Sequence, residues 1–360
     1  MKKVLFPRVR FKGFSEEWKE ERISNILTYV QPWKYLTKKK NFDILGDIPV
    51  LTANKSLLLG YSVEDNYYNK ECIIFDDFTQ DFKYINYPFL LKSSAIKILI
   101  PNNNYSISFI FFLFQSLRFE SQGHARHYIS YVQKKLIRLP STNEANKIIK
   151  LLENIDNLIF LEEIKLNKLK QLKETLLQKM FPEGNSKTPR IRFRGFDEEW
   201  KEEVLGKIIK NAYVGISSKI LITGKYEVIQ QGITNIAGYT NEQPFENYEK
   251  IVLFGDHSLS VYKPKKPFLL ASDGIKAYFI ENTYGDYFYY LLGNNLPENE
   301  GYKRYSLILK EKNIWITYNK SEQQKIGDFF CKIDTLLDLY QSKLNKLRQI
   351  KESLLQKMFV

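Results

Sequence analysis

The chain has 360 residues, enough for two or three domains that each bury their own core. Hydrophobic residues make up 44% of it and aromatic residues 15%, which argues against a wholly disordered chain. The formal net charge of +13 favours a polyanionic partner, nucleic acid first and an anionic membrane second, over a protein whose basic charge serves solubility alone.

Three further features bear on where the protein works. The only cysteines, Cys72 and Cys331, are far apart and match no metal-binding or disulfide spacing, which indicates a reducing cytoplasm. The N-terminus has too short an apolar run for a signal peptide. The most apolar segment, residues 107–114, is well short of the ~20 residues that span a bilayer. We expect this segment and its repeat mate, 286–292, to be helices buried inside a domain, and we expect no membrane contact.

A charged and aromatic segment opens the chain and occurs a second time. Residues 7–21 and 189–203 match at 12 of 15 positions, at an offset of 182. Trp18 and Trp200 hold the same place in the two copies and are flanked by charge. We interpret both as local packing anchors, with contact to a partner as the alternative. The offset falls to 178 from Gly123 onward, so the first repeat is four residues longer, 182 minus 178.

The middle of each repeat differs from its mate, while the two ends match. Residues 22–121 and 204–300 carry short β-branched and aromatic runs separated by Gly, Asn and Asp, which is typical of short strands. We predict an α/β (mixed α+β) globule in each repeat, with mostly short strands and one apolar helix. Matched ends favour one task performed twice, and divergent middles favour surfaces that face different targets. The strand-like runs include 48–51, 72–75, 96–100, 226–229, 251–254 and 277–280.

Each globule is followed by a long helical pattern. Ser141 starts a Ser-x-x-Glu capping box, and no Pro or Gly interrupts the pattern before Pro182. About 40 residues at roughly 1.5 Å each give a rod of about 60 Å. A second run opens at Asn319, 178 residues after its counterpart, and the rod tips, 170–181 and 348–359, match at 9 of 12 positions.

Apolar residues recur along both rods in three- and four-residue steps, which puts one apolar stripe on each. We predict that the two stripes pair as an antiparallel coiled coil between two pseudo-twofold-related globules, leaving outer faces for other subunits. The predicted domains are globules at 1–140 and 187–318, a central spacer helix at 141–186 and a distal spacer helix at 319–360. The predicted helix-packing residues are Ile148, Leu152, Ile155, Ile159, Leu166, Leu169, Leu172, Leu176, Ile326, Phe330, Ile333, Leu337, Leu344, Leu347, Ile350 and Leu354.

The sequence contains no catalytic set that we can identify. It has no phosphate-binding loop for ATP, no Asn-Pro-Pro-Tyr type tetrapeptide of an adenine methyltransferase, and no Gly-x-Gly loop for the methyltransferase cofactor. Asp76, Asp77 and Asp81 leave a metal-dependent nuclease site as an alternative, although they are crowded into one loop. His124 and His127 are close together, but no carboxylate or thiol joins them, so we predict no metal site. We therefore expect a chain that is not an enzyme on its own.

Candidate DNA contacts gather in a loop that follows the apolar helix of each repeat. Residues 123–127 read Gly-His-Ala-Arg-His and precede a strand-like run, 128–132; their mate, 301–305, reads Gly-Tyr-Lys-Arg-Tyr. Arg126 and Arg304 align at the common offset. Arginine can form paired hydrogen bonds to guanine or contact phosphate, so this loop suits DNA. The alternative is that both arginines are solvated loop residues.

Further candidates are basic clusters and polar loop residues after strand-like runs. The basic clusters could contact phosphate or be plain surface, and the polar pairs could read base edges. Including the loop above, the candidate DNA-binding residues are His124, Arg126, His127, Tyr302, Lys303, Arg304, Lys38, Lys39, Lys40, Asn54, Lys55, Lys134, Lys135, Gln230, Gln231, Lys263, Lys265 and Lys266.

These repeats resemble the specificity subunit of Type I restriction–modification enzymes. The Phe-x-Gly-Phe-x-x-Glu-Trp opening, at residues 11–18 and 193–200, is similar to the start of that family's two target-recognition domains. The Leu-Leu-Gln-Lys-Met-Phe tips are similar to the ends of its two spacer helices. The resemblance covers both openings, both rods and their order. In that family the part of the recognition domain that holds the candidate arginine loop lies near DNA.

The resemblance implies a sequence-specific DNA-recognition subunit without catalysis of its own. Each globule would read one half of a bipartite site in double-stranded DNA, and the helices would set the gap. Two modification subunits, which methylate adenine, would dock on the helices, and two restriction subunits would join for translocation and cleavage. S-adenosylmethionine, ATP and Mg would then belong to those partners. The alternative function is a coiled-coil scaffold that binds proteins without specific DNA recognition.

Overall fold

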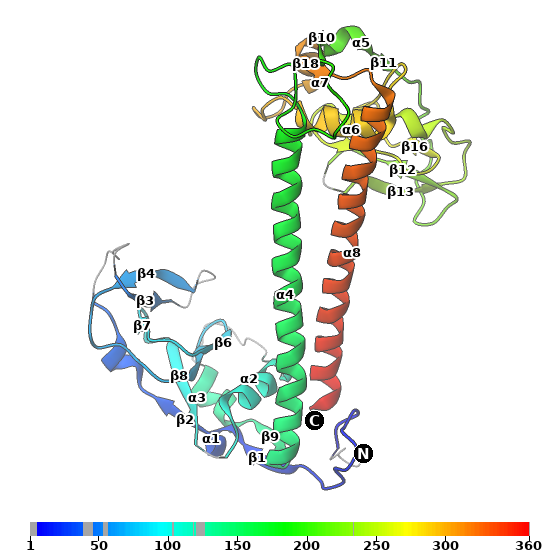
Figure 1. Ribbon diagram of the computed structural model, residues 1–360. Coiled ribbons are helices and arrows are strands. Elements are labelled where there is room, and N and C mark those ends of the chain that lie inside the picture. The colour runs from blue at the N-terminus through cyan, green and yellow to red at the C-terminus, as the bar shows by residue number, and fades with distance from the viewer. Residues whose placement is uncertain are drawn as a thin grey trace. The chain divides into compact units, whose positions relative to one another are not determined.

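The structure, a computed structural model, describes residues 6–38, 46–52, 57–102, 104–117, 119, 127–232 and 234–359. The chain divides into two compact units. The first unit is Met1–Glu162 together with Lys343–Val360, and the second is Glu163–Ser342. Each unit therefore combines one globule with parts of both long helices (Figure 1).

The first unit contains a four-stranded sheet, a three-stranded sheet and a two-stranded ribbon, in the orders β2-β8-β5-β6, β4-β3-β7 and β1-β9. All neighbouring strands are antiparallel except β3 and β7. The strands are β1 (Lys19–Arg22), β2 (Leu27–Val30), β3 (Ile48–Leu51), β4 (Leu58–Ser62), β5 (Cys72–Asp76), β6 (Phe82–Ile85), β7 (Leu90–Leu91), β8 (Ile96–Pro101) and β9 (Leu136–Leu139). The short helices are α1 (Ile23–Ile26), η1 (Pro32–Tyr35), α2 (Ile107–Ser116), α3 (His127–Ser130) and η2 (Val132–Lys134).

The second unit repeats this architecture strand for strand. Its sheets have the orders β11-β17-β14-β15, β13-β12-β16 and β10-β18, and again one pair, β12 with β16, is parallel. The strands are β10 (Lys201–Val204), β11 (Ile209–Asn211), β12 (Tyr226–Ile229), β13 (Ile236–Thr240), β14 (Val252–Gly255), β15 (Val261–Tyr262), β16 (Phe268–Leu270), β17 (Ile275–Ile280) and β18 (Asn313–Ile316). The short helices are α5 (Leu205–Ile208), η3 (Tyr248–Lys250), α6 (Gly285–Asn294) and α7 (Tyr305–Glu311).

The two apolar segments are buried helices, as predicted. Ser106 caps α2 by accepting a hydrogen bond from the Phe109 amide. In each unit this helix joins a core cluster with the start of the long helix that follows the globule. Trp18 and Trp200 are buried in these clusters, which supports their interpretation as packing anchors. In the described residues, no helix is long and apolar enough to cross a membrane.

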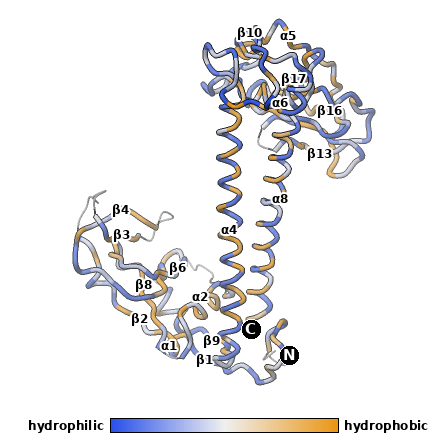
Figure 2. The backbone as a smooth tube through the Cα atoms, viewed as in Figure 1, coloured by the Kyte–Doolittle hydropathy of each residue, from blue (hydrophilic) through white to orange (hydrophobic). Residues whose placement is uncertain are grey.

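Two 39-residue helices, α4 (Thr142–Met180) and α8 (Lys320–Met358), form the predicted rods. Ion pairs between them join rising residue numbers on α4 to falling ones on α8, so the helices pair antiparallel in the first unit. In the first unit, Glu162 pairs with Lys343 at 2.9 Å and Asp156 with Lys351 at 2.6 Å. Apolar residues recur along both helices between polar ones (Figure 2).

The tip of each long helix completes the core of a globule. Phe359, at the end of α8, packs edge-on against Trp18 in the first unit, with ring centroids 6.3 Å apart. Phe181, just after α4, makes the same edge-on contact with Trp200 in the second unit, at 5.8 Å. The identical tip residues thus perform the same packing task in both units, and the first globule is closed by residues that follow the second unit in the chain.

A buried arginine–glutamate pair ties each opening segment to the start of its long helix. Arg10 donates to both carboxylate oxygens of Glu144, at 2.7 and 2.8 Å, and Arg192 does the same to Glu322, at 2.6 and 3.0 Å. Trp18 also donates its indole N–H to Glu144. Both carboxylates are buried, where an unpaired negative charge would be costly, and the arginine compensates that charge.

Three local predictions were wrong. The glutamate of the Ser141 box does not reach back to its own cap as a capping box requires, because its carboxylate is held by Arg10; only the serine half of the box forms. Residues 128–132 are not strand-like, since they lie in α3, η2 and the turn between them. Leu172 and Ile350 are half exposed and so do not fill the helix seam.

The remaining predicted helix-packing residues divide between two environments. Those near the helix starts pack into the globule cores: Ile148, Leu152, Ile326, Phe330 and Ile333. Those further along are buried or half buried on the helices: Ile155, Ile159, Leu166, Leu169, Leu176, Leu337, Leu344, Leu347 and Leu354. Of these, Leu169, Leu176 and Leu337 pack against the core of the second unit and Leu354 against that of the first, so the stripe serves a globule core near both ends of each rod.

Candidate nucleic-acid interface

A buried aspartate anchors the candidate DNA-contact loop in the second unit. Asp256 follows β14, and its carboxylate accepts a hydrogen bond from the Ser306 amide at 2.8 Å, at the start of α7. Its backbone carbonyl accepts from the Tyr305 amide at 2.9 Å. The Tyr305 hydroxyl in turn donates to the Gly301 carbonyl at 2.6 Å. These bonds hold residues 301–305 against the turn that follows β14.

The first unit carries the same anchor. The carboxylate of Asp77 accepts from the Tyr128 amide at 2.8 Å, and its carbonyl accepts from the His127 amide. Lys97 lies 3.1 Å from the Asp77 carboxylate, and both side chains are almost fully buried. Asp77 is thus occupied by packing and pairing within the fold, which removes it from the alternative nuclease site. The described residues hold no group of three or more His, Cys, Asp or Glu side chains that could bind a metal ion.

Replacing Asp256 by alanine is expected to loosen the loop without unfolding the unit. Loss of its carboxylate leaves the Ser306 amide without its partner, which should cost about 1–3 kcal/mol. Hydrogen exchange of the intact chain, followed by mass spectrometry, should then show faster exchange across residues 301–309. Asp273, which is exposed, provides the control in Asp273→Ala. Equal protection of this loop in both variants would rule out the anchoring role.

The loop and the turn bring together residues from two separate predicted groups. His257, at the tip of the turn, stacks its ring on that of Tyr302, with centroids 4.7 Å apart and planes 5° apart. Its Nδ1 lies 2.9 Å from the Lys303 carbonyl, and its amide donates to the Oε1 of Gln231 at 3.2 Å. Gln231 and the loop at 301–305 therefore share one surface, and His257 connects them. Sequence reasoning missed His257, which no basic cluster or loop motif marks.

The same surface carries positive charge. Arg304 is exposed, and its guanidinium makes no ion pair or hydrogen bond with any residue in the described ranges. Lys303 pairs with Glu300, and this hydrogen bond raises the pKa of the Lys303 ammonium group. Gln230 donates its side-chain amide to Thr234, which fixes it beside Gln231. Among the described residues at this surface, Arg304 is thus the cation without a protein partner.

Other predicted contacts are in different surroundings. His127 is buried, so its ring is not available to DNA and this prediction was wrong. Lys263 and Lys265 line a hollow of about 800 Å³ beside α6 and α8, and burial lowers the pKa of Lys263. Lys266 pairs with Glu227 at 2.9 Å. These lysines belong to a part of the second unit other than the 301–305 loop.

In the first unit, Lys38 and Lys134 are exposed. Lys135 lies over the ring of Phe119, with its Nζ 5.6 Å from the ring centroid. The predictions for Lys39, Lys40, Asn54, Lys55, His124 and Arg126 lie outside the described residues. The described residues include the whole candidate loop of the second unit and only the end of its mate, so Arg304 and its neighbours carry the argument.

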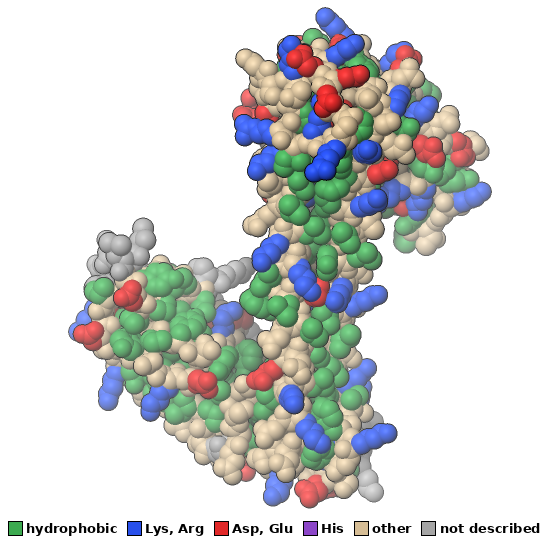
Figure 3. Space-filling model, viewed as in Figure 1, with side chains coloured by type: hydrophobic (Ala, Val, Ile, Leu, Met, Phe, Trp, Pro, Cys, Tyr) green, Lys and Arg blue, Asp and Glu red, His purple; other side chains and the backbone are tan. Residues whose placement is uncertain are grey.

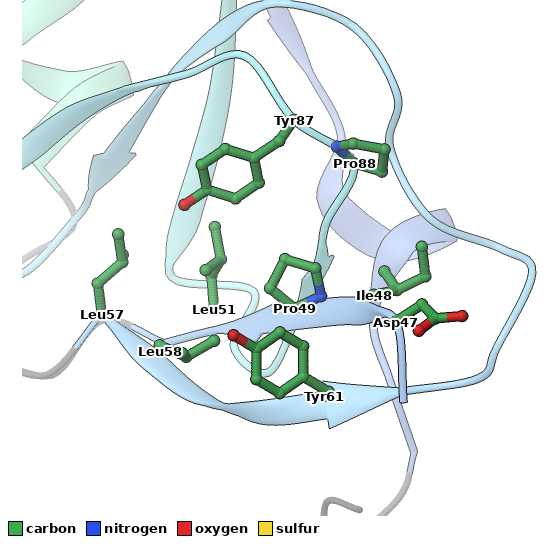
Figure 4. A pocket seen from close by; sticks show the side chains of 9 residues that line it. All are labelled: Asp47, Ile48, Pro49, Leu51, Leu57, Leu58, Tyr61, Tyr87 and Pro88. Carbon is green, nitrogen blue, oxygen red and sulfur yellow. The ribbon is translucent and has the colours of Figure 1, made fainter. Parts of the chain in front are cut away.

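A shallow apolar hollow lies on the three-stranded sheet of the first unit. It has a volume of about 370 Å³ and lies between β3, β4 and the segment at Tyr87 and Pro88 (Figure 4). On the matching edge of the second unit, Leu221 exchanges two backbone hydrogen bonds with Tyr239 on β13.

Apolar side chains are also exposed at matched positions on the long helices. In the first unit these are Leu158, Leu161 and Ile350, and in the second Leu336, Leu339 and Leu172; each pair is separated by 178 residues. Figure 3 shows hydrophobic side chains at the surface along both helices, among lysines. Covering exposed apolar side chains removes their surface from water, which is favourable. The matched patches are therefore suited to binding a partner at two equivalent places.

Part of the chain matches a known protein family. Residues 15–171 match the family model described as the Type I restriction modification DNA specificity domain. A curated relative from Escherichia coli, the Type I restriction enzyme EcoR124I/EcoR124II specificity subunit, is 34% identical over 143 residues, which are 38% of this chain and 35% of the relative. The chain thus matches about a third of that relative's length.

Solved structures share the fold over nearly the whole chain. The S subunit of a Type I restriction-modification system from M. genitalium has a TM-score of 0.69 at 16% identity and covers 99% of both chains. A chain from a type I R-M system, solved to explain complex assembly and conformational transition, has a TM-score of 0.54 at 14% identity, covering 95% of this chain and 97% of that one. At such identities the likeness concerns the fold alone.

Proposed function

Because residues 15–171 match the model of the Type I restriction modification DNA specificity domain, we propose that the chain is the DNA-recognition subunit of such a complex. Each globule reads one half of a bipartite site in double-stranded DNA, and the two long helices set the gap between the halves. The observation that carries this proposal is the exposed surface of His257, Tyr302 and Arg304, held in place by the buried Asp256.

The chemistry of this surface suits DNA. Arg304 has no protein partner in the described ranges and is free to bind a phosphate or the O6 and N7 edge of a guanine. The exposed Tyr302 and the side chains beside it offer stacking and hydrogen bonds. Anchoring by Asp256 keeps these groups on rigid backbone, so binding costs less ordering of side chains and loop. The net charge of +13 adds attraction to the phosphate backbone.

The repeated helix surface supports a proposal for the partners. Two modification subunits dock on the leucine and isoleucine patches, one per unit, because the two patches carry matched residues 178 positions apart. Methylation of adenine with S-adenosylmethionine belongs to these subunits. Two restriction subunits that use ATP and Mg join them in the cytoplasm, where the host DNA lies. The recognition chain supplies position and sequence choice to all of them, and carries out no catalysis itself.

Methylation mapping tests this function. The chain is co-expressed with the adenine methyltransferase subunit from its own genome, and the host DNA is sequenced for methylated adenine. The wild type is expected to give methylation at a split motif. Arg304→Ala is expected to abolish it or to relax one half-site, because loss of a paired contact to guanine costs about 1–3 kcal/mol, roughly 5- to 150-fold in affinity. Lys250→Ala, at an exposed lysine that is not among the candidate contacts, should keep the wild-type motif.

The scaffold alternative predicts a different result. A protein-binding scaffold would form a stable complex with the methyltransferase subunit and leave the host DNA unmethylated. Salt-titrated DNA binding of the purified complex then separates a scaffold from a specificity subunit with a defective partner. A DNA-binding complex loses affinity with rising salt at a log–log slope of about −0.9 per phosphate contacted, whereas a scaffold shows no specific binding at any salt concentration.

A further inference from the structure

The turn that carries His257 has the same unusual backbone in both units. Leu259, in the turn after β14, has φ of +55°, and Gln80, at the matched place after β5, has φ of +62°. A side chain with a Cβ atom disfavours this left-handed conformation. The described residues contain only one other non-glycine residue with positive φ, Asn282. The shape of this turn is thus kept in both repeats, although neither copy uses the glycine that would adopt it without strain.

The residue at the tip of the turn differs between the units. His257 follows the anchoring Asp256, and Phe78 follows Asp77, at the same offset of 179. Phe78 is 43% exposed, so the first unit displays an apolar ring where the second displays an imidazole. One backbone therefore presents two different recognition groups, beside a loop that both units anchor in the same way. A position with fixed geometry and variable chemistry suits sequence choice.

Hydrogen bonding fixes what His257 can offer to a ligand. The Lys303 carbonyl can only accept, so Nδ1 of His257 is the ring nitrogen that carries the hydrogen. In the neutral ring, Nε2 then has a lone pair and acts as an acceptor. Nε2 makes no hydrogen bond with the part of the chain that the structure describes. The stack on Tyr302 and the bond from the His257 amide to Gln231 hold the ring in this orientation.

We propose that His257 is a specificity-determining residue of the second domain, and that its Nε2 accepts a hydrogen bond from the exocyclic amino group of an adenine or a cytosine. In the major groove only these two bases present an amino donor, at N6 and N4, so an acceptor at this place selects them against guanine and thymine. The inference rests on the proposed recognition function and adds to it a residue and the chemical class of base that it reads.

The test combines a protein change with a base change. His257→Phe keeps an aromatic ring for the stack on Tyr302 and removes the Nε2 acceptor. The complex of each variant with the methyltransferase subunit is bound to duplexes in which one amino group of the mapped second half-site is removed, with purine in place of adenine or 2-pyrimidinone in place of cytosine. At one position of the half-site, removal of the amino group should lower the affinity of the wild type about three- to tenfold, which corresponds to one hydrogen bond. At that same position, removal of the amino group should not change the affinity of His257→Phe, because the variant lacks the acceptor.

Each outcome decides between the proposals. If the wild-type complex methylates no split motif, the recognition function fails before His257 is examined. If a motif is mapped but His257→Phe responds to every amino-group deletion as the wild type does, the assignment of His257 is overturned and the recognition function stands. Binding is measured directly, so loss of methylation in the variant does not obscure the result. Phe78→His is the matched control: it should change the first half-site and leave the second unchanged.

Discussion

Replacing Phe359 by alanine is expected to lower the free energy of unfolding of the first unit by about 3–5 kcal/mol. This residue lies at the end of the chain, yet its ring packs against Trp18 near the beginning, and against Phe109 of α2 at 5.8 Å. Removing a buried ring leaves a cavity that the surrounding side chains fill only in part. Hydrogen exchange of the intact chain should report the loss as faster exchange in α2 and β9.

The matched variant is Phe181→Ala, which removes the equivalent ring from the second unit. Phe181 contacts Trp200 and also stacks on Tyr287, at 6.1 Å. The Phe181→Ala variant should accelerate hydrogen exchange in α6 and leave α2 protected, which is the reverse of the pattern for Phe359→Ala. If Phe359→Ala left the N-terminal globule fully protected, the helix tip would not be part of that core.

Replacing Arg10 by methionine should destabilise the first unit by a similar amount, about 3–5 kcal/mol, because it leaves the Glu144 carboxylate buried without its cation. Both side chains are largely buried, with 13% of the arginine and 1% of the glutamate exposed, so solvent screens the pair little. The hydrogen bond to Glu144 raises the pKa of the Arg10 guanidinium, so the arginine stays charged throughout the neutral range. Urea unfolding of the intact chain, monitored by hydrogen exchange in peptides from each unit, measures the change in the free energy of unfolding.

The control is again supplied by the repeat. Arg192→Met removes the partner of Glu322 and should destabilise the second unit instead. A double variant, Arg192→Met with Glu322→Leu, should recover much of the loss, because an apolar pair of similar volume avoids the unpaired charge. No recovery in the double variant would mean that the arginine acts through packing of its stem and its hydrogen bond to the Glu198 carbonyl rather than through charge.

The features that the sequence predicted well are those that depend on local pattern. Residues 141–181 and 319–359 have uninterrupted helical spacing, and the helices occupy 142–180 and 320–358. The strand-like run at 48–51 is β3, and 72–75 lies within β5. The resemblance of the openings and tips to the Type I specificity family agrees with the family match and the shared fold.

The features that the sequence could not predict depend on residues far apart in the chain. Glu144 has the spacing of a capping box, but its partner is Arg10, 134 residues away, and only the fold brings them together. Leu172 and Ile350 continue the apolar spacing but are about half exposed. Spacing identifies the apolar side chains on a helix face, and it does not show which of them the fold buries. His257 was missed since its role depends on Tyr302 and Lys303, which follow it by more than 40 residues.

The two units differ in how far apart in the chain their parts lie. The second unit is continuous, from residue 163 to 342. The first unit also needs residues 343–360, which follow the whole of the second unit. Trp18 and its packing partner Phe359 are 341 residues apart, so at about 5–20 residues per second Trp18 waits roughly 17–68 s during synthesis for this contact. The second unit is therefore made in full before the first is completed. A chain cut before residue 343 would expose the apolar core of the first unit, which makes it a substrate for chaperones and proteases.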